Sequence, residues 1–159
     1  MPNINPKEAG DNFYPRYNVV TTEPVDASVD VAKGFLYTKN SSGNLVKASE
    51  TTDWFLRGCY QATRGFTASS TAGADTVQCF GPGSRIGIEA AGALVRGDRV
   101  MVHATNGKAI AFAEKTAGTF TFEDLNRTFG RVYRIYSRTD FETEKDVAAS
   151  GDIVVVVLE

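Results

Sequence analysis

The chain has 159 residues and a net charge of −2, with 15 glycines, 10 phenylalanines and 6 tyrosines. This length suits a single domain with a substantial core, and the slightly acidic balance argues against a dedicated nucleic-acid-binding protein. The longest apolar run, residues 153–158, is far shorter than the roughly 18 residues that a membrane-spanning helix needs. We therefore expect neither nucleic acid nor a membrane as a partner.

The first 25 residues do not look like core sequence. Prolines interrupt them repeatedly, and residues 1–10 are polar, so no secretory signal is expected. We predict an extended N-terminal arm over residues 1–25, followed by one β domain over residues 26–159. Aromatic and arginine side chains commonly anchor protein interfaces. The arm's predicted partner contacts are Phe13, Tyr14, Arg16 and Tyr17. The alternative is that these aromatic side chains fold back onto the chain's own barrel.

The first half of the β domain begins with a predicted hairpin. Residues 35–38 and 45–48 are short apolar runs, and an Asn-, Ser- and Gly-rich turn separates them. A strand introduced by glycine follows at Gly58, and a strand introduced by an acidic residue follows over residues 73–80. Val, Thr, Phe and Tyr recur in such short runs along the chain, which predicts an all-β fold.

Residues 96–113 hold the clearest element of the sequence. Apolar and polar residues alternate before Asn106-Gly107 and a second run follows this pair, as in a hairpin with a two-residue turn. That turn would place Val102 opposite Ala111. Both faces of the predicted hairpin carry apolar side chains, so both need cover.

The C-terminal third contains a predicted helical turn at residues 123–126, a strand over 130–138 and an exposed charged loop over 139–146. The last predicted strand, residues 151–159, shows no polar alternation, so both of its faces must be covered. The cover is either a second sheet together with the arm, or another copy of the chain. We favour a homo-oligomer.

The two halves of the chain repeat one order of features. A basic-glycine pair, a hairpin, a glycine-led strand and an acidic-led strand occur first from Lys33-Gly34 and again from Arg96-Gly97. This order predicts an internal duplication. The alternative is that β domains repeat such turns by chance.

No motif of a catalytic or cofactor site is present. His103 is the single histidine, so a metal site would need acidic or thiol ligands from elsewhere. Neither a glycine-rich phosphate loop nor a nucleophile elbow occurs. Asp98 and Asp152 each follow a glycine at the start of a strand and are interpreted as turn residues. We therefore predict no enzyme activity, no metal and no cofactor.

Three further features of the sequence have open interpretations. Cys59 and Cys79 lie in predicted strands; reduced thiols are expected, and a disulfide is possible if the strands are neighbours. The tripeptide 96–98 matches a motif of cell-adhesion ligands, which short sequences often match by chance. A basic series, whose members Arg131 and Arg134 are also predicted partner contacts, favours ion pairs across a subunit interface. The series comprises Arg127, Arg131, Arg134 and Arg138.

A family resemblance follows from these strands. The basic-glycine strand, the hairpin at 106–111, the strand led by Gly130 and the final strand at 149–156 resemble the small all-β decoration (cement) proteins of tailed bacteriophage heads. The resemblance spans residues 30–159. It implies a β-barrel or jelly-roll-like sandwich, commonly a trimer, made in the bacterial host cytoplasm. On the virion, it implies binding to the major capsid protein on the capsid exterior, at junctions between capsomers, and stabilisation of the shell. The long aromatic arm departs from the shortest members of that family.

Other functions remain open at this point. Trp54, Tyr60 and Tyr133 are aromatic residues of the kind that stack on sugars in a carbohydrate-binding module, although burial in a core is the commoner role. A tail-tube or head–tail joining protein is a further virion alternative. A trimeric jelly-roll nucleotide hydrolase is disfavoured, because its glycine-rich C-terminal motif is missing.

Overall fold

A computed structural model of the chain describes residues 12–14, 18–26, 29–52, 58–62, 73–103, 107–112 and 121–159. These residues form strands and one short helix, so the predicted all-β class is confirmed. No helix within them is long and apolar enough to cross a membrane. The elements are β1 (Asn12–Tyr14), β2 (Asn18–Val25), β3 (Tyr37–Lys39), β4 (Leu45–Lys47), β5 (Cys59–Ala62), β6 (Gly73–Phe80), β7 (Arg85–Glu89), β8 (Arg99–Val102), β9 (Ala109–Ala111), α2 (Phe122–Asn126), β10 (Thr128–Tyr136) and β11 (Ile153–Leu158).

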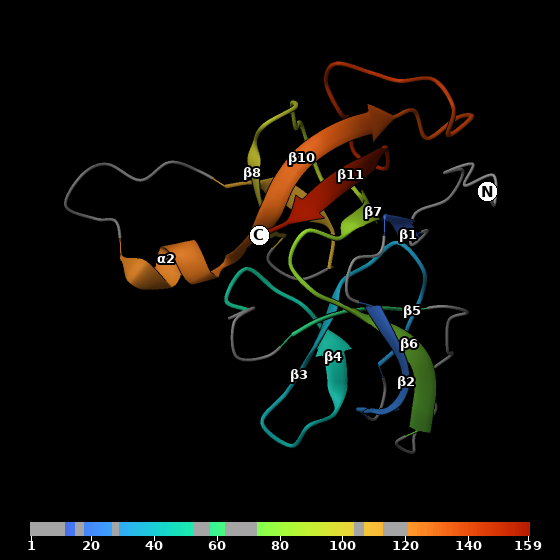
Figure 1. Ribbon diagram of the computed structural model, residues 1–159, viewed down its shortest axis with the longest axis vertical. Helices are drawn as coiled ribbons and strands as arrows, with labels where there is room; N and C mark the ends of the chain where they lie inside the picture. Colours follow the sequence, from blue (N-terminus) through green and yellow to red (C-terminus); the bar gives the residue numbers. More distant parts are fainter. Residues whose placement is uncertain are drawn as a thin grey trace.

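The strands form two sheets (Figure 1). The first half of the chain makes a closed barrel in the order β2-β4-β3-β5-β6. The second half makes a six-stranded sheet in the order β1-β7-β11-β10-β8-β9, with β1 added from the N-terminus.

The two sheets repeat one strand order, as the predicted duplication requires. β4-β3-β5-β6-β2 in the barrel corresponds to β9-β8-β10-β11-β7 in the second sheet. Each half also has a parallel closing contact, which joins Val25 to Leu45 in the first half and Ala90 to Ala109 in the second. The Asp26 amide donates to the Leu45 carbonyl at 3.1 Å, and the Ala91 amide donates to the Ala109 carbonyl at 2.8 Å. The second half therefore repeats the closing contact of the barrel as a single bridge.

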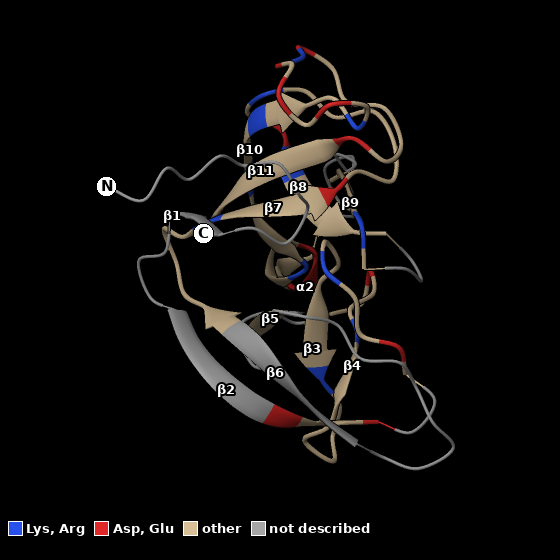
Figure 2. Cartoon of the chain, turned by 90° about the vertical axis from the view of Figure 1, so that its right-hand side faces the viewer, with Lys and Arg blue, Asp and Glu red and all other residues tan. Residues whose placement is uncertain are grey.

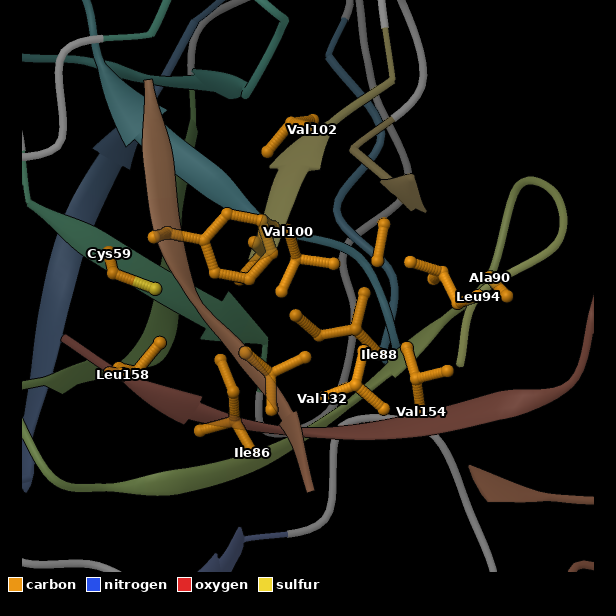
Figure 3. Packing of buried hydrophobic residues seen from close by; sticks show 14 of the residues in the cluster. Cys59, Ile86, Ile88, Ala90, Leu94, Val100, Val102, Val132, Val154 and Leu158 are labelled. Carbon is orange, nitrogen blue, oxygen red and sulfur yellow. The ribbon is translucent and has the colours of Figure 1, made fainter. Parts of the chain in front are cut away.

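The main hydrophobic core lies between the two halves and draws on both. Ile86, Val100 and Val154 of the second sheet pack in one cluster with Cys59 and Phe80 of the barrel. Figure 3 shows this cluster, with Cys59 and Leu158 at one end and Ala90 and Leu94 at the other. The barrel also has its own smaller cluster, formed by Val25, Val31, Tyr37 and Leu45. Burial of apolar surface thus holds the halves together.

The hairpin β8–β9 forms where the sequence predicts it, but its register is different. Val102 lies opposite Ala109 rather than Ala111, and the His103 amide donates to the Lys108 carbonyl at 2.8 Å. The connection therefore spans four residues instead of two. Because the register is shifted by two residues, every side chain keeps its predicted face.

A contact with the barrel accompanies this longer connection. Gly107 has φ +70°, as predicted for a turn glycine, and its carbonyl accepts the Leu36 amide at 2.9 Å. A Cβ atom on Gly107 would lie 2.8 Å from the Leu36 carbonyl oxygen. The glycine thus allows the hairpin end to approach the barrel backbone closely.

The last strand, β11, is covered on both faces within the chain. Its even-numbered residues belong to the main core. On the other face, Ile153 and Val155 are buried against Tyr136 and Phe141, which come from β10 and the loop after it. The apolar character of this strand is therefore no argument for a second copy, and that step of the sequence interpretation is corrected.

The N-terminal segment contributes strands to the chain's own sheets. β1 pairs with β7, and β2 pairs with β6 along its whole length. Val25 is fully buried. The sequence predicted an extended arm at the position of these strands. Pro24 does not end β2, because it lies in the ladder opposite Ala74. Residues 1–11 and 15–17 lie outside the described residues.

The predicted helical turn at residues 123–126 is present as α2. The Asp124 carboxylate accepts the amide of Thr121 at 2.9 Å, which satisfies a donor at the helix start. Phe122 begins this helix. The Phe122 side chain is 87% exposed.

Candidate interface on the six-stranded sheet

One row of residues crosses the second sheet from edge to edge. The strand registers align Tyr14, Arg85, Val157, Arg131 and Arg99 on β1, β7, β11, β10 and β8. Directly paired residues share one face of a sheet. The adjacent row points into the core, so the arginines of this row lie on the outer face. They are blue on β7, β8 and β10 in Figure 2.

A bulge in β10 adds a tyrosine and a fourth arginine to this face. Val132 and Arg134 pair with successive residues of β11, so Tyr133 is the extra residue between them. The guanidinium carbons of Arg85 and Arg134 lie 4.1 and 5.3 Å from the centre of the Tyr133 ring. We call Arg85, Arg99, Arg131, Arg134 and Tyr133 the arginine surface. Such cation–π contacts hold the side chains in place.

Acidic groups of the same chain pair with part of the basic series. Arg131 contacts Glu159 at 2.7 Å, and Arg134 lies 3.9 Å from the Glu144 carboxylate. Arg127 lies 3.4 Å from Asp124. Three arginines of the predicted series, Arg127, Arg131 and Arg134, therefore have acidic partners within their own chain. These arginines are partly exposed, so each pair contributes little to stability.

A pocket of about 470 Å³ opens beside this surface, where the barrel meets the second sheet. Both halves and α2 contribute to its wall. Burial raises the pKa of the Cys59 thiol, which therefore stays neutral in the wall. The lining residues are Gly58, Cys59, Phe80, Gly81, Pro82, Arg99, Leu125, Asn126, Thr128, Phe129, Leu158 and Glu159.

The structure brings together some of the predicted contact residues. Arg131 and Arg134 are exposed on β10, and β1, which holds Phe13 and Tyr14, is the edge strand of the same sheet. Arg16 and Tyr17 lie outside the described residues. The sequence did not predict that Arg85 and Arg99 belong to the arginine surface. Each is the partly buried first residue of its strand, but only the long-range register shows that they share a row.

The two cysteines are free thiols. β5 and β6 are neighbours, but Cys59 pairs with Phe80 and Cys79 pairs with Tyr60. Burial also raises the pKa of Cys79. The disulfide that the sequence left open is therefore not formed.

The tripeptide 96–98 forms a turn. Gly97 has φ +86°, and the Asp98 carboxylate accepts the Val95 amide at 2.8 Å. Arg96 pairs with Glu144 at 2.7 Å. All three residues thus have a role in the local structure of the turn.

The other singled-out side chains are not gathered in one place. Trp54 lies outside the described residues, and Tyr60 is partly buried beneath the Lys39 ammonium group, 5.4 Å from its ring centre. His103 is partly buried, and its Nδ1 atom is buried without a hydrogen-bond partner among the residues that the structure describes. In the part of the chain that the structure describes, no three His, Cys, Asp or Glu side chains cluster as metal ligands would.

Comparisons with known proteins include a solved phage structure with a similar fold. No known protein family matches the sequence, and no curated protein matches it. Among solved structures, the chain is similar to the head fiber gp8.5 N base of bacteriophage phi29, with a TM-score of 0.52 and 14% sequence identity. The match covers 89% of this chain and 95% of that one. The chain therefore has the fold of this phage head fiber base, along nearly the whole length of both.

Proposed function

We propose that the chain is a structural protein of a bacteriophage virion, attached to the outside of the head. The observation that carries this proposal is the shared fold with a head fiber base, because the likeness extends over both repeated halves rather than over one common motif. Fold alone does not determine function. The exposed arginine surface adds a site with the chemistry of a protein interface.

In this proposal the arginine surface binds acidic groups of the major capsid protein. Arginine and tyrosine are the side chains that most often dominate binding energy, and the contacts around Tyr133 pre-order them. A trimer at junctions between capsomers would present three such surfaces. Interfaces of about 800 Å² per partner, repeated over the shell, would add up to resistance against rupture.

The carbohydrate alternative receives less support from the described residues. The ring of Tyr133, which would stack on a sugar, already has the guanidinium groups of Arg85 and Arg134 over it. Tyr60 is partly buried and contacts Lys39. The geometry favours recognition of an anionic protein surface over recognition of a sugar face.

Charge reversal on the arginine surface tests this proposal. We expect Arg134→Glu to weaken co-sedimentation with phage heads that lack the protein by about tenfold or more, since loss of a charged contact costs on the order of 2 kcal/mol. Lys47→Glu is the matched control, because this exposed residue carries the same charge on the barrel. Equal binding by the wild type and Arg134→Glu would contradict the proposed surface.

Deletion of residues 1–17 tests the N-terminal segment. β2 begins at Asn18, so the closed barrel keeps all its strands, and the second sheet loses only its edge strand β1. We expect a folded protein, by circular dichroism, that binds heads more weakly. Full binding by the truncated chain in the same sedimentation assay would remove Phe13 and Tyr14 from the interface.

A further inference from the structure

An exposed phenylalanine marks the start of α2. This helix stands out to one side of the molecule (Figure 1), and Phe122 at its first position is 87% exposed. An aromatic side chain of this size carries a large apolar surface, and its burial against a partner is strongly favourable. Glu123, the next residue, is also exposed, so the helix end presents an apolar and an acidic group side by side.

The pocket beside α2 has the complementary character. Its wall includes the apolar side chains of Phe80, Leu125, Phe129 and Leu158. Its volume of about 470 Å³ is large enough for an aromatic ring. Arg99 is the basic residue among those that line it, while Glu159 at the same pocket is bound to Arg131. The pocket thus offers an apolar floor and a cation.

We propose that Phe122 of one copy of the chain inserts into this pocket of a second copy. Phe122 does not fill the pocket of its own chain, since the side chain is exposed. In the complex, Glu123 of the inserting copy lies against Arg99 of the receiving copy, and this charge match points to a second copy as the occupant. Every chain carries both Phe122 and the pocket, so two copies in a reciprocal dimer, or several copies in a ring, would fill every pocket. The proposal goes beyond head attachment and is tested without capsids.

Sedimentation equilibrium of the purified full-length protein tests the contact. The wild type is expected to self-associate, and Phe122→Ala to raise the dissociation constant by about tenfold to a hundredfold, as loss of a buried aromatic anchor does. Val147→Ala is the matched control, because this residue is 51% exposed and lies outside the pocket wall. A monomeric wild type, or unchanged association of Phe122→Ala, overturns the proposal. The exposure of Phe122 predicts an unchanged circular dichroism spectrum for the variant.

A native thiol in the pocket allows a direct test of the geometry. Cys59 lines the pocket, so Phe122→Cys in a Cys79→Ser background should form an intermolecular disulfide with it under oxidation. Adding Cys59→Ser should abolish this cross-link. A cross-link that persists without Cys59 places Phe122 elsewhere and overturns the proposal. Restored association when Glu123→Arg is combined with Arg99→Glu would identify the ion pair.

Discussion

Replacing Gly130 with alanine is expected to lower the free energy of unfolding by about 3 kcal/mol, since overpacking against backbone atoms forces strands apart. Gly130 lies in β10 between β11 and β8. A Cβ atom there would lie 2.1 Å from the Val157 carbonyl oxygen and 2.7 Å from a methyl group of Val156. The nearest obstacle is backbone, so the pairing of β10 with β11 must shift to make room.

Urea denaturation followed by circular dichroism measures this effect. Gly92→Ala is the matched control, because nothing lies within 4 Å of a Cβ atom at Gly92 and its φ is not positive. We expect the control to change the unfolding midpoint little. A loss of less than about 1 kcal/mol in Gly130→Ala would show that the sheet accommodates the methyl group easily.

Replacing Asp152 with alanine is expected to cost about 3 kcal/mol of stability, because it removes one member of a buried charged network. The Asp152 side chain is 2% exposed. Its carboxylate accepts the amides of Ala149 and Arg138 at 2.7 and 2.9 Å and pairs with the Lys145 ammonium at 2.5 Å. The residue is therefore more than the turn former that the sequence indicated: it anchors the loop between β10 and β11.

The same network makes the stability depend on pH. Burial alone raises the pKa of Asp152, but the hydrogen bonds from Lys145, Ala149 and Arg138 outweigh it and hold the pKa below its usual value. The stabilisation is thus fully present above about pH 4, the unfolded value for an aspartate, and is lost as the pH falls through the lower folded value. Wild-type stability should drop over that acid range.

Asp152→Asn should flatten this acid dependence. The difference in unfolding free energy between the wild type and the variant should be largest near neutral pH and should shrink as the pH falls into the acid range. Asp146→Asn, at an exposed position of the same loop, is the control and should keep the wild-type profile. Parallel profiles for Asp152→Asn and the wild type would mean that other carboxylates govern the acid transition.

The hairpin β8–β9 shows which structural features the local residue pattern predicts and which it does not. Alternation placed Val100 and Val102 on one face of the strand, because side-chain direction in a strand has a period of two, and the structure buries that face. The length of the turn could not be predicted from the residues of the hairpin alone. The Gly107 carbonyl is bonded to the Leu36 amide of the barrel, so the connection serves a contact that lies far away in the sequence.

The predicted contact surface shows the same limit. The spacing of Arg131 and Arg134 along one strand was visible in the sequence, but the bulge at Tyr133, which leaves all three side chains exposed, was not. Arg85 reaches the Tyr133 ring because β11 places β7 and β10 on its two sides. The residue pattern of neither β7 nor β10 predicts that these strands lie on the two sides of β11.

By itself, the sequence determined the all-β class, the two hairpins, the turn at α2 and the repeated order of strands, because these depend on side-chain alternation and on residues that favour turns. Only the tertiary structure decided which strands are neighbours. That choice aligned Arg85, Arg131 and Arg99 in one row and covered β11 within the chain. Pairing between distant strands depends on how the whole core packs, and a local period of two residues carries no information about that packing.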